Sequence, residues 1–220
     1  INFAAFAKAT ELQKRIWFTL IALVGIGLSL SLPLLSLEME RMGLSARTIG
    51  LNTATAGIAS IVVVPFVPAI AARIGVGRWI AIALAITLVM LLAFRFIFDI
   101  RAWFVLRFLF AGGLGSLFVL SEYWIATSAP AARRGLIMGI YATVLSLGFA
   151  AGPMLLAVVG TSGWPPYLAG AALYAAAALP LLVARHRLPT LDRAPRHSFS
   201  RYLVAVPLAS RFFSQSVVVP

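Results

Sequence analysis

One long apolar stretch of this sequence holds two charged side chains, Arg107 and Glu122, and an ionisable group there needs a partner or a function. Arg107 is five residues past Ala102, the start of one stretch, and therefore about 8 Å deep if the stretch is helical. A guanidinium at that depth can turn inward to a water-filled cavity and bind a solute there. Alternatively, the long side chain can extend to the nearer lipid headgroups. The cavity is the preferred interpretation.

Glu122 is the only acidic side chain inside these stretches. It lies 15 residues beyond Arg107, about 22 Å along a helix, and so near the opposite end of the stretch. A carboxylate in a low-dielectric site can bind and release a proton, which makes proton transfer one hypothesis. A solvated helix end is another. The expected neighbours at this end are all basic: Arg73, Arg78, Arg133 and Arg134.

Enzyme chemistry has no recognisable set of residues here. The sequence has no cysteine, and its two histidines, His186 and His197, lie between apolar stretches and too far apart for a metal cluster. The glycine-rich segment Gly112–Ser116 lacks the lysine of a nucleotide-binding loop and falls within an apolar stretch. We therefore expect no enzyme activity, no metal and no cofactor.

The composition is that of a membrane protein. The chain is 62% hydrophobic and only 11% charged, with a mean hydropathy of +1.01, whereas soluble domains are about 25% charged. A membrane helix needs about 20 apolar residues. Six stretches meet this length and a seventh begins near Leu203: Ile16–Leu37, Leu51–Ala72, Trp79–Phe98, Ala102–Ile125, Leu136–Gly160 and Tyr167–Ala184. The sequence predicts an all-α, polytopic membrane helix bundle that is part of a longer protein.

The net charge of +12 is distributed as in a membrane protein rather than a nucleic-acid-binding protein. With the N-terminus in the cytoplasm, most basic residues fall on cytoplasmic segments, as orientation rules require. These are Lys8, Lys14, Arg15, Arg73, Arg78, Arg133, Arg134, Arg185, Arg187, Arg193, Arg196 and Arg201, against Arg41, Arg47, Arg95 and Arg101 outside. The expected location is the bacterial cytoplasmic membrane, with anionic lipid near the link after residue 184.

The chain also aligns with itself at a shift of 85 residues. Residues that apolar composition alone does not explain coincide without a gap: Gly27 with Gly112, Ser31 with Ser116, Ser36 with Ser121, Gly50 with Gly135, Pro68 with Pro153, Gly75 with Gly160 and Trp79 with Trp164. Each copy, about 16–100 and 101–185, holds three spans, so the second crosses the membrane in the opposite direction. Inverted three-helix repeats are typical of secondary transporters.

This organisation resembles the N-terminal half of a major facilitator superfamily transporter. Residues 1–184 would be its six-helix N-terminal domain, residues 185–202 a basic cytoplasmic linker, and residues 203–220 the start of a seventh helix. In that family the turn between helices 2 and 3 reads Gly, three residues, Asp-Arg-x-Gly-Arg-Arg. Here Arg73 and Gly75 match, whereas Pro68, Ala72 and Val76 depart from the pattern, so its carboxylate is missing.

Helix 5 carries the stronger resemblance. The antiporters of the family have Gly, eight residues, Gly, three residues, Gly-Pro, then two residues and Gly-Gly. The matching residues are Gly139, Gly148, Gly152 and Pro153, with Leu156 and Ala157 in place of the final pair. Glycines one turn apart allow a second helix to approach closely, and a proline within a helix bends it.

Helix 4 gives a third resemblance, since the family often has an arginine there followed by small residues. Arg107 precedes Ala111, Gly112, Gly113 and Gly115 in this way. In the family, an acid at the inner end of helix 4 pairs with the 2–3 turn and holds the inner side closed. The resemblance thus implies a conformational latch formed by Arg73, Gly75, Arg78 and Glu122, a third hypothesis for that carboxylate.

The resemblance implies a secondary transporter that moves a small solute by alternating access, with proton-coupled antiport or efflux as the form that helix 5 suggests. Its partners would be a small-molecule substrate, the lipid bilayer, a C-terminal six-helix half and protons. Helices 1, 4 and 5 would offer Arg107, Ser29, Ser31 and Tyr141 to a substrate cavity. The alternative is a membrane scaffold or assembly factor that keeps the frame without transporting.

Overall fold

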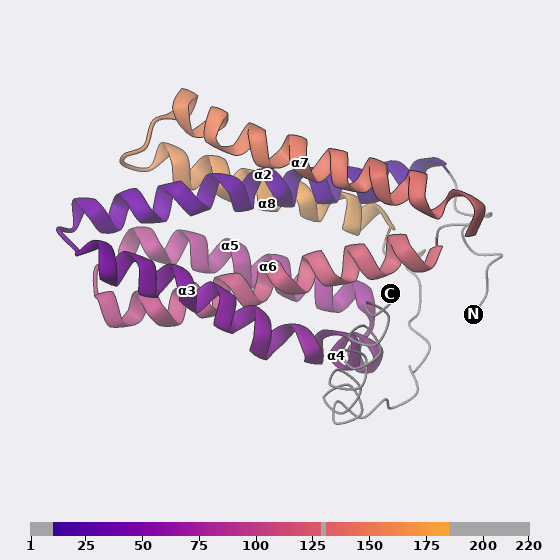
Figure 1. Ribbon diagram of the computed structural model, residues 1–220, viewed down its shortest axis with the longest axis horizontal. Coiled ribbons are helices and arrows are strands. Elements are labelled where there is room, and N and C mark those ends of the chain that lie inside the picture. Colours follow the sequence, from indigo (N-terminus) through magenta and orange to yellow (C-terminus); the bar gives the residue numbers. More distant parts are fainter. Residues whose placement is uncertain (1–10, 129–130, 185–220) are drawn as a thin grey trace, which may run out of the picture. The chain divides into compact units, whose positions relative to one another are not determined.

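The computed structural model describes residues 11–128 and 131–184, which form helices joined by short turns (Figure 1). The elements are α2 (Glu11–Arg41), α3 (Ala46–Val63), the 3₁₀ helix η1 (Val64–Phe66), α4 (Val67–Ile74), α5 (Val76–Phe96), α6 (Ile100–Ser128), η2 (Ala131–Arg133), α7 (Arg134–Val159) and α8 (Pro165–Ala184). The predicted linker, seventh span and both histidines lie outside the described residues.

Five described segments are long and apolar enough to cross a membrane. They lie within α2, the continuous run from α3 to α4, α5, α6 and α7. The 20-residue α8 follows as the sixth helix of the bundle and covers the predicted span Tyr167–Ala184. The prediction of an all-α membrane bundle is confirmed.

Two glycine turns mark the internal repeat in the backbone. Gly75 ends α4 with φ +93°, and Gly160 ends α7 with φ +87°. This left-handed region is costly for residues that carry a Cβ, so a glycine is required at each turn. The two glycines are 85 residues apart and therefore occupy equivalent positions in the two copies.

Helix packing follows the same symmetry. The first helix of the first copy, α2, packs most extensively on α7 and α8, and its equivalent α6 packs on α3 and α5. In the 85-residue alignment α2 corresponds to α6, α3 to α7 and α5 to α8, so the contacts of α2 and those of α6 are equivalent. Figure 1 shows α2 and α6 running in opposite directions. The fold therefore contains two inverted three-helix repeats, and each repeat packs its first helix on the other.

Two details differ from the sequence prediction. The second span is interrupted by η1, because Pro65 and Pro68 have no N–H to donate to the helical hydrogen-bond ladder. The segment between the first two predicted spans, residues 38–50, is also shorter than expected. Helix α2 continues to Arg41, and α3 begins at Ala46. The side chain of Ser45 caps α3 by accepting a hydrogen bond from the Thr48 N–H at 3.3 Å.

The central helices of this unit are α2 and α6. Of an 18-residue apolar segment in each helix, 56% is buried in α2 and 61% in α6. The corresponding share is only 17% in the run from α3 to α4 and 17% in α7. An aromatic cluster of Phe94, Trp103, Phe110 and Tyr174 joins α5, α6 and α8 through edge-to-face contacts, the shortest with ring centroids 4.8 Å apart. This packing fixes the first turns of α6, which carry Arg107.

Candidate substrate cavity

Arg107 is buried inside the helical unit. It lies seven residues after the start of α6, about 10 Å along the helix, and its side chain is only 1% exposed. One terminal nitrogen lies 3.5 Å from Oγ1 of Thr53 on α3, and Nε has no hydrogen-bond partner. Such burial fits an inward-facing guanidinium better than one that extends to the headgroups.

Beside Arg107 is a cavity of about 140 Å³ between α2, α3 and α6. Ser60 and Arg107 supply its only polar side chains, and the Ser60 hydroxyl is already used in a 3.1 Å bond to the Ala56 carbonyl. The remaining lining residues are apolar: Leu28, Leu32, Ala56, Phe110, Ala111, Leu114, Gly115 and Phe118. A molecule bound there meets one cationic group, one hydroxyl whose proton is already donated, and otherwise hydrocarbon.

The other three predicted cavity residues are not brought together with Arg107. The single hydroxyl hydrogen of Ser29 is shared between the carbonyls of Ile26 and Gly148, each 3.1 Å from Oγ, and the side chain lies between α2 and α7. Ser31 is fully buried and donates to the Leu28 carbonyl at 2.8 Å. Tyr141 is 6% exposed and packs in an apolar cluster with Ile21 and Ile125. Their part in substrate binding stays a prediction.

Two of the helix-5 glycines, Gly148 and Gly152 on α7, lie at the contact with α2. A Cβ placed on Gly148 would be 3.2 Å from the Ala22 carbonyl oxygen, and one on Gly152 would be 2.6 Å from the Leu30 backbone nitrogen. These backbones can approach so closely only because neither glycine has a side chain. By contrast, Gly139 is exposed and a Cβ there would meet no atom within 4 Å; Pro153 is also exposed.

The predicted inner latch is not paired in this structure. Arg73 and Arg78 flank the Gly75 turn, and both side chains are exposed, as is that of Glu122 on α6. Among the described residues, neither arginine forms an ion pair with the carboxylate. A latch at this end therefore requires a conformation in which these groups approach, and it stays a prediction.

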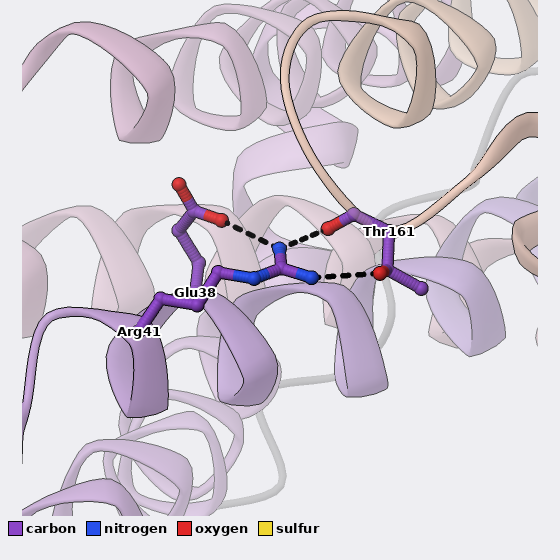
Figure 2. Close-up of polar contacts among 3 residues, drawn as sticks. All are labelled: Glu38, Arg41 and Thr161. Carbon is purple, nitrogen blue, oxygen red and sulfur yellow. Dashed lines mark hydrogen bonds and ion pairs between the residues drawn. The ribbon is translucent and has the colours of Figure 1, made fainter.

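At the opposite end of the helical unit, α2 and the α7–α8 turn form a polar contact that the sequence did not reveal. Arg41, at the end of α2, donates to the Glu38 carboxylate at 3.1 Å and to Oγ1 of Thr161 at 2.7 Å. It also donates to the Thr161 carbonyl, as Figure 2 shows. We call these three residues the outer clasp. It ties α2 to the turn between α7 and α8, and its only local signal is the i, i+3 spacing of the ion pair.

Comparison with known proteins adds two findings to this geometry. The family model described as Major Facilitator Superfamily matches residues 17–219. The chain is also similar to the uncharacterized MFS-type transporter YfkF of Bacillus subtilis (strain 168), with 28% identity over 149 residues. That alignment covers 68% of this chain and 38% of the relative, so the chain matches well under half of the relative's length.

The family match extends over nearly the whole chain and includes all the helices that surround Arg107. It agrees with the inverted repeats, the apolar helices and the glycine contact between α2 and α7. Together the family and the apolar helices identify a multi-pass integral membrane protein. The chain belongs to the Major Facilitator Superfamily.

Proposed function

We propose that this chain is the N-terminal half of a secondary transporter that moves a small solute by alternating access. The observation that carries the proposal is the buried Arg107 in the wall of a cavity between α2, α3 and α6. A buried charge is costly, and in membrane proteins such charges commonly mark substrate or ion pathways. A second six-helix half would supply the opposite wall, and rocking of the halves would expose the site to each side in turn.

The domain limits follow from this proposal. Residues 1–184 form the six-helix half, residues 185–202 the cytoplasmic linker, and residues 203–220 begin the second half. We place the protein in the bacterial cytoplasmic membrane with its N-terminus in the cytoplasm.

Solute uptake by the full-length protein in proteoliposomes tests the function. We expect a solute to accumulate or exchange across the vesicle membrane only when the protein is present. Uptake that rises with an imposed pH gradient would support proton-coupled antiport, as the helix-5 glycines suggest. A protein that binds no solute and moves none under either condition would instead fit a membrane scaffold.

The topology predicts opposite labelling of two exposed turns. Ala132 in η2 and Ser162 in the α7–α8 turn are both exposed and lie at opposite ends of α7. Because the chain has no cysteine, Ala132→Cys and Ser162→Cys each create a single label site. A membrane-impermeant maleimide applied to intact cells should label only Ser162→Cys. Labelling of both variants, or of Ala132→Cys alone, would contradict the orientation.

The latch predicts a conformational effect of Glu122→Gln. Removing the charge should shift the protein toward its inward-open state by at most about fivefold, because an exposed ion pair contributes at most about 1 kcal/mol. Substrate affinity should change little. Alkylation of a cysteine introduced on the cytoplasmic side reports the opening. Glu40→Gln, which removes an exposed carboxylate at the outer end, is the control. If Glu122→Gln abolished proton-driven uptake yet spared energy-independent exchange, the carboxylate would carry protons instead.

A further inference from the structure

The positive charge of Arg107 has no counter-ion among the acids whose side chains the structure describes. Glu38 pairs with Arg41 in the outer clasp. Asp99 accepts hydrogen bonds from the first backbone N–H groups of α6, the shortest at 2.6 Å. Glu40 and Glu122 are both exposed. Arg107 therefore differs from ordinary buried ions in proteins, which are paired.

The guanidinium also has unused hydrogen-bonding capacity. It carries five N–H donors, yet the Thr53 hydroxyl, at 3.5 Å, is its only acceptor in the described part of the chain. Its Nε–H is buried without an acceptor. The natural complement of a forked, cationic donor is a carboxylate or phosphate, which can accept two parallel hydrogen bonds. An anion is the ligand that would satisfy both the charge and the donors.

The remainder of the cavity defines the rest of that ligand. From Arg107, the lining extends along α6 to Phe118, 11 residues or about 16 Å away, and the residues between are apolar. The described helices form one wall of this space, whose volume is about 140 Å³, so the lining indicates the polarity of the bound group rather than its size. A single guanidinium balances a single negative charge, which favours a monocarboxylate over a doubly charged phosphate.

We propose that the substrate is an organic monoanion: a carboxylate that pairs with Arg107 and an apolar body that lies toward Phe118. This rests on the proposed transport function and names the class of solute. Substrate charge then replaces the missing counter-ion, so that anion binding relieves the cost of burying the guanidinium. A neutral or cationic solute of the same shape gains no such compensation.

The test compares three probes of nearly equal shape: benzoate, benzamide and benzylamine. Binding to the purified full-length protein in lipid nanodiscs is measured by calorimetry and by the shift in unfolding temperature. We expect benzoate to bind more tightly than benzamide, and benzylamine to bind least. Equal affinity for benzoate and benzamide, or no binding of benzoate, would overturn the proposal.

Three variants locate the effect. Arg107→Gln should weaken benzoate binding about ten- to a hundredfold, which is the change in affinity that one hydrogen bond to a charged group typically provides. The affinity for benzamide should stay nearly unchanged. Arg107→Lys keeps the charge without the fork and should keep the preference for benzoate at lower affinity. Arg101→Gln removes an exposed charge from the same helix and should have no effect. Unchanged benzoate binding in Arg107→Gln would contradict the proposal.

Counterflow in proteoliposomes separates this inference from the transport function. If carboxylates bind through Arg107 but neither they nor other solutes cross the membrane, the anion site stands and the transport proposal fails. If a neutral or cationic solute is transported while carboxylates fail to bind, transport stands and the anion inference fails. The relative affinities of the three probes are measured on the wild-type protein. The proposal can therefore be tested even if Arg107→Gln folds poorly.

Discussion

Gly152→Ala is expected to separate α7 from α2 and to destabilise the protein by about 3 kcal/mol, at the upper end of the usual cost of overpacking. The added methyl group would overlap Oγ of Ser29 and would lie 2.6 Å from the Leu30 nitrogen and 2.8 Å from the Ile26 oxygen. The hydroxyl can rotate away, but the two backbone atoms can move only with the whole helix. Unfolding temperature in detergent measures the loss.

The same helix provides a graded control. Gly139→Ala adds the same methyl group where no atom lies within 4 Å, so it should be neutral or stabilise the helix by up to about 1 kcal/mol. Gly148→Ala, with its nearest contact at 3.2 Å, should fall between the two. Equal unfolding temperatures for all three variants would mean that α2 and α7 do not meet through these glycines.

Trp103→Ala is the second large effect, because it removes a fully buried indole near the start of α6. The ring packs edge-to-face on Phe94 at 4.8 Å, and its N–H donates to the Ile97 carbonyl at 2.6 Å. Truncating a buried tryptophan typically costs about 3–5 kcal/mol. Trp103 also lies one turn before Arg107 on the same helix face. We therefore expect benzoate binding to weaken along with stability.

Trp164→Ala is the matched control. This indole is 39% exposed and contacts the Phe96 ring at 5.1 Å and the Arg95 guanidinium at 5.5 Å. An exposed cation–π contact contributes about 0.5–1 kcal/mol, so the loss should be several times smaller than at Trp103. Trp103→Phe, which keeps a ring but loses the N–H, should be intermediate. Similar losses at both tryptophans would contradict this account of the α5–α6 corner.

The sequence predicted the helices and their repeat because each leaves a mark in residue type. A membrane span needs a long apolar run, and the φ near +90° at Gly75 and Gly160 requires glycine at both turns. The interruption at Pro65 was missed because the apolar run continues through it. The sequence does not show which apolar helix faces contact each other, because leucine packs equally well against lipid and against another helix.

The candidate site was predictable only in part for a related reason. Arg107 stands out because a charge in an apolar run is costly wherever it points. Ser29 and Ser31 are predicted to line the cavity because the resemblance places their helix there, and this stays a prediction, since each hydroxyl also donates to a carbonyl within its own helix. The outer clasp joins Arg41 to Thr161, 120 residues apart, and no local pattern foretells that contact.

The exchange of partners between the two repeats has a consequence for biosynthesis. The main partner of α2 is α7, which begins at Arg134, 93 residues after α2 ends at Arg41. At about 5–20 residues per second, a ribosome needs roughly 5–20 seconds to make that interval. During this time the face of α2 that receives Gly148 and Gly152 is in the bilayer without its helix. We therefore expect the first three helices to insert early but to remain loosely associated, and open to insertion chaperones, until the fifth helix arrives.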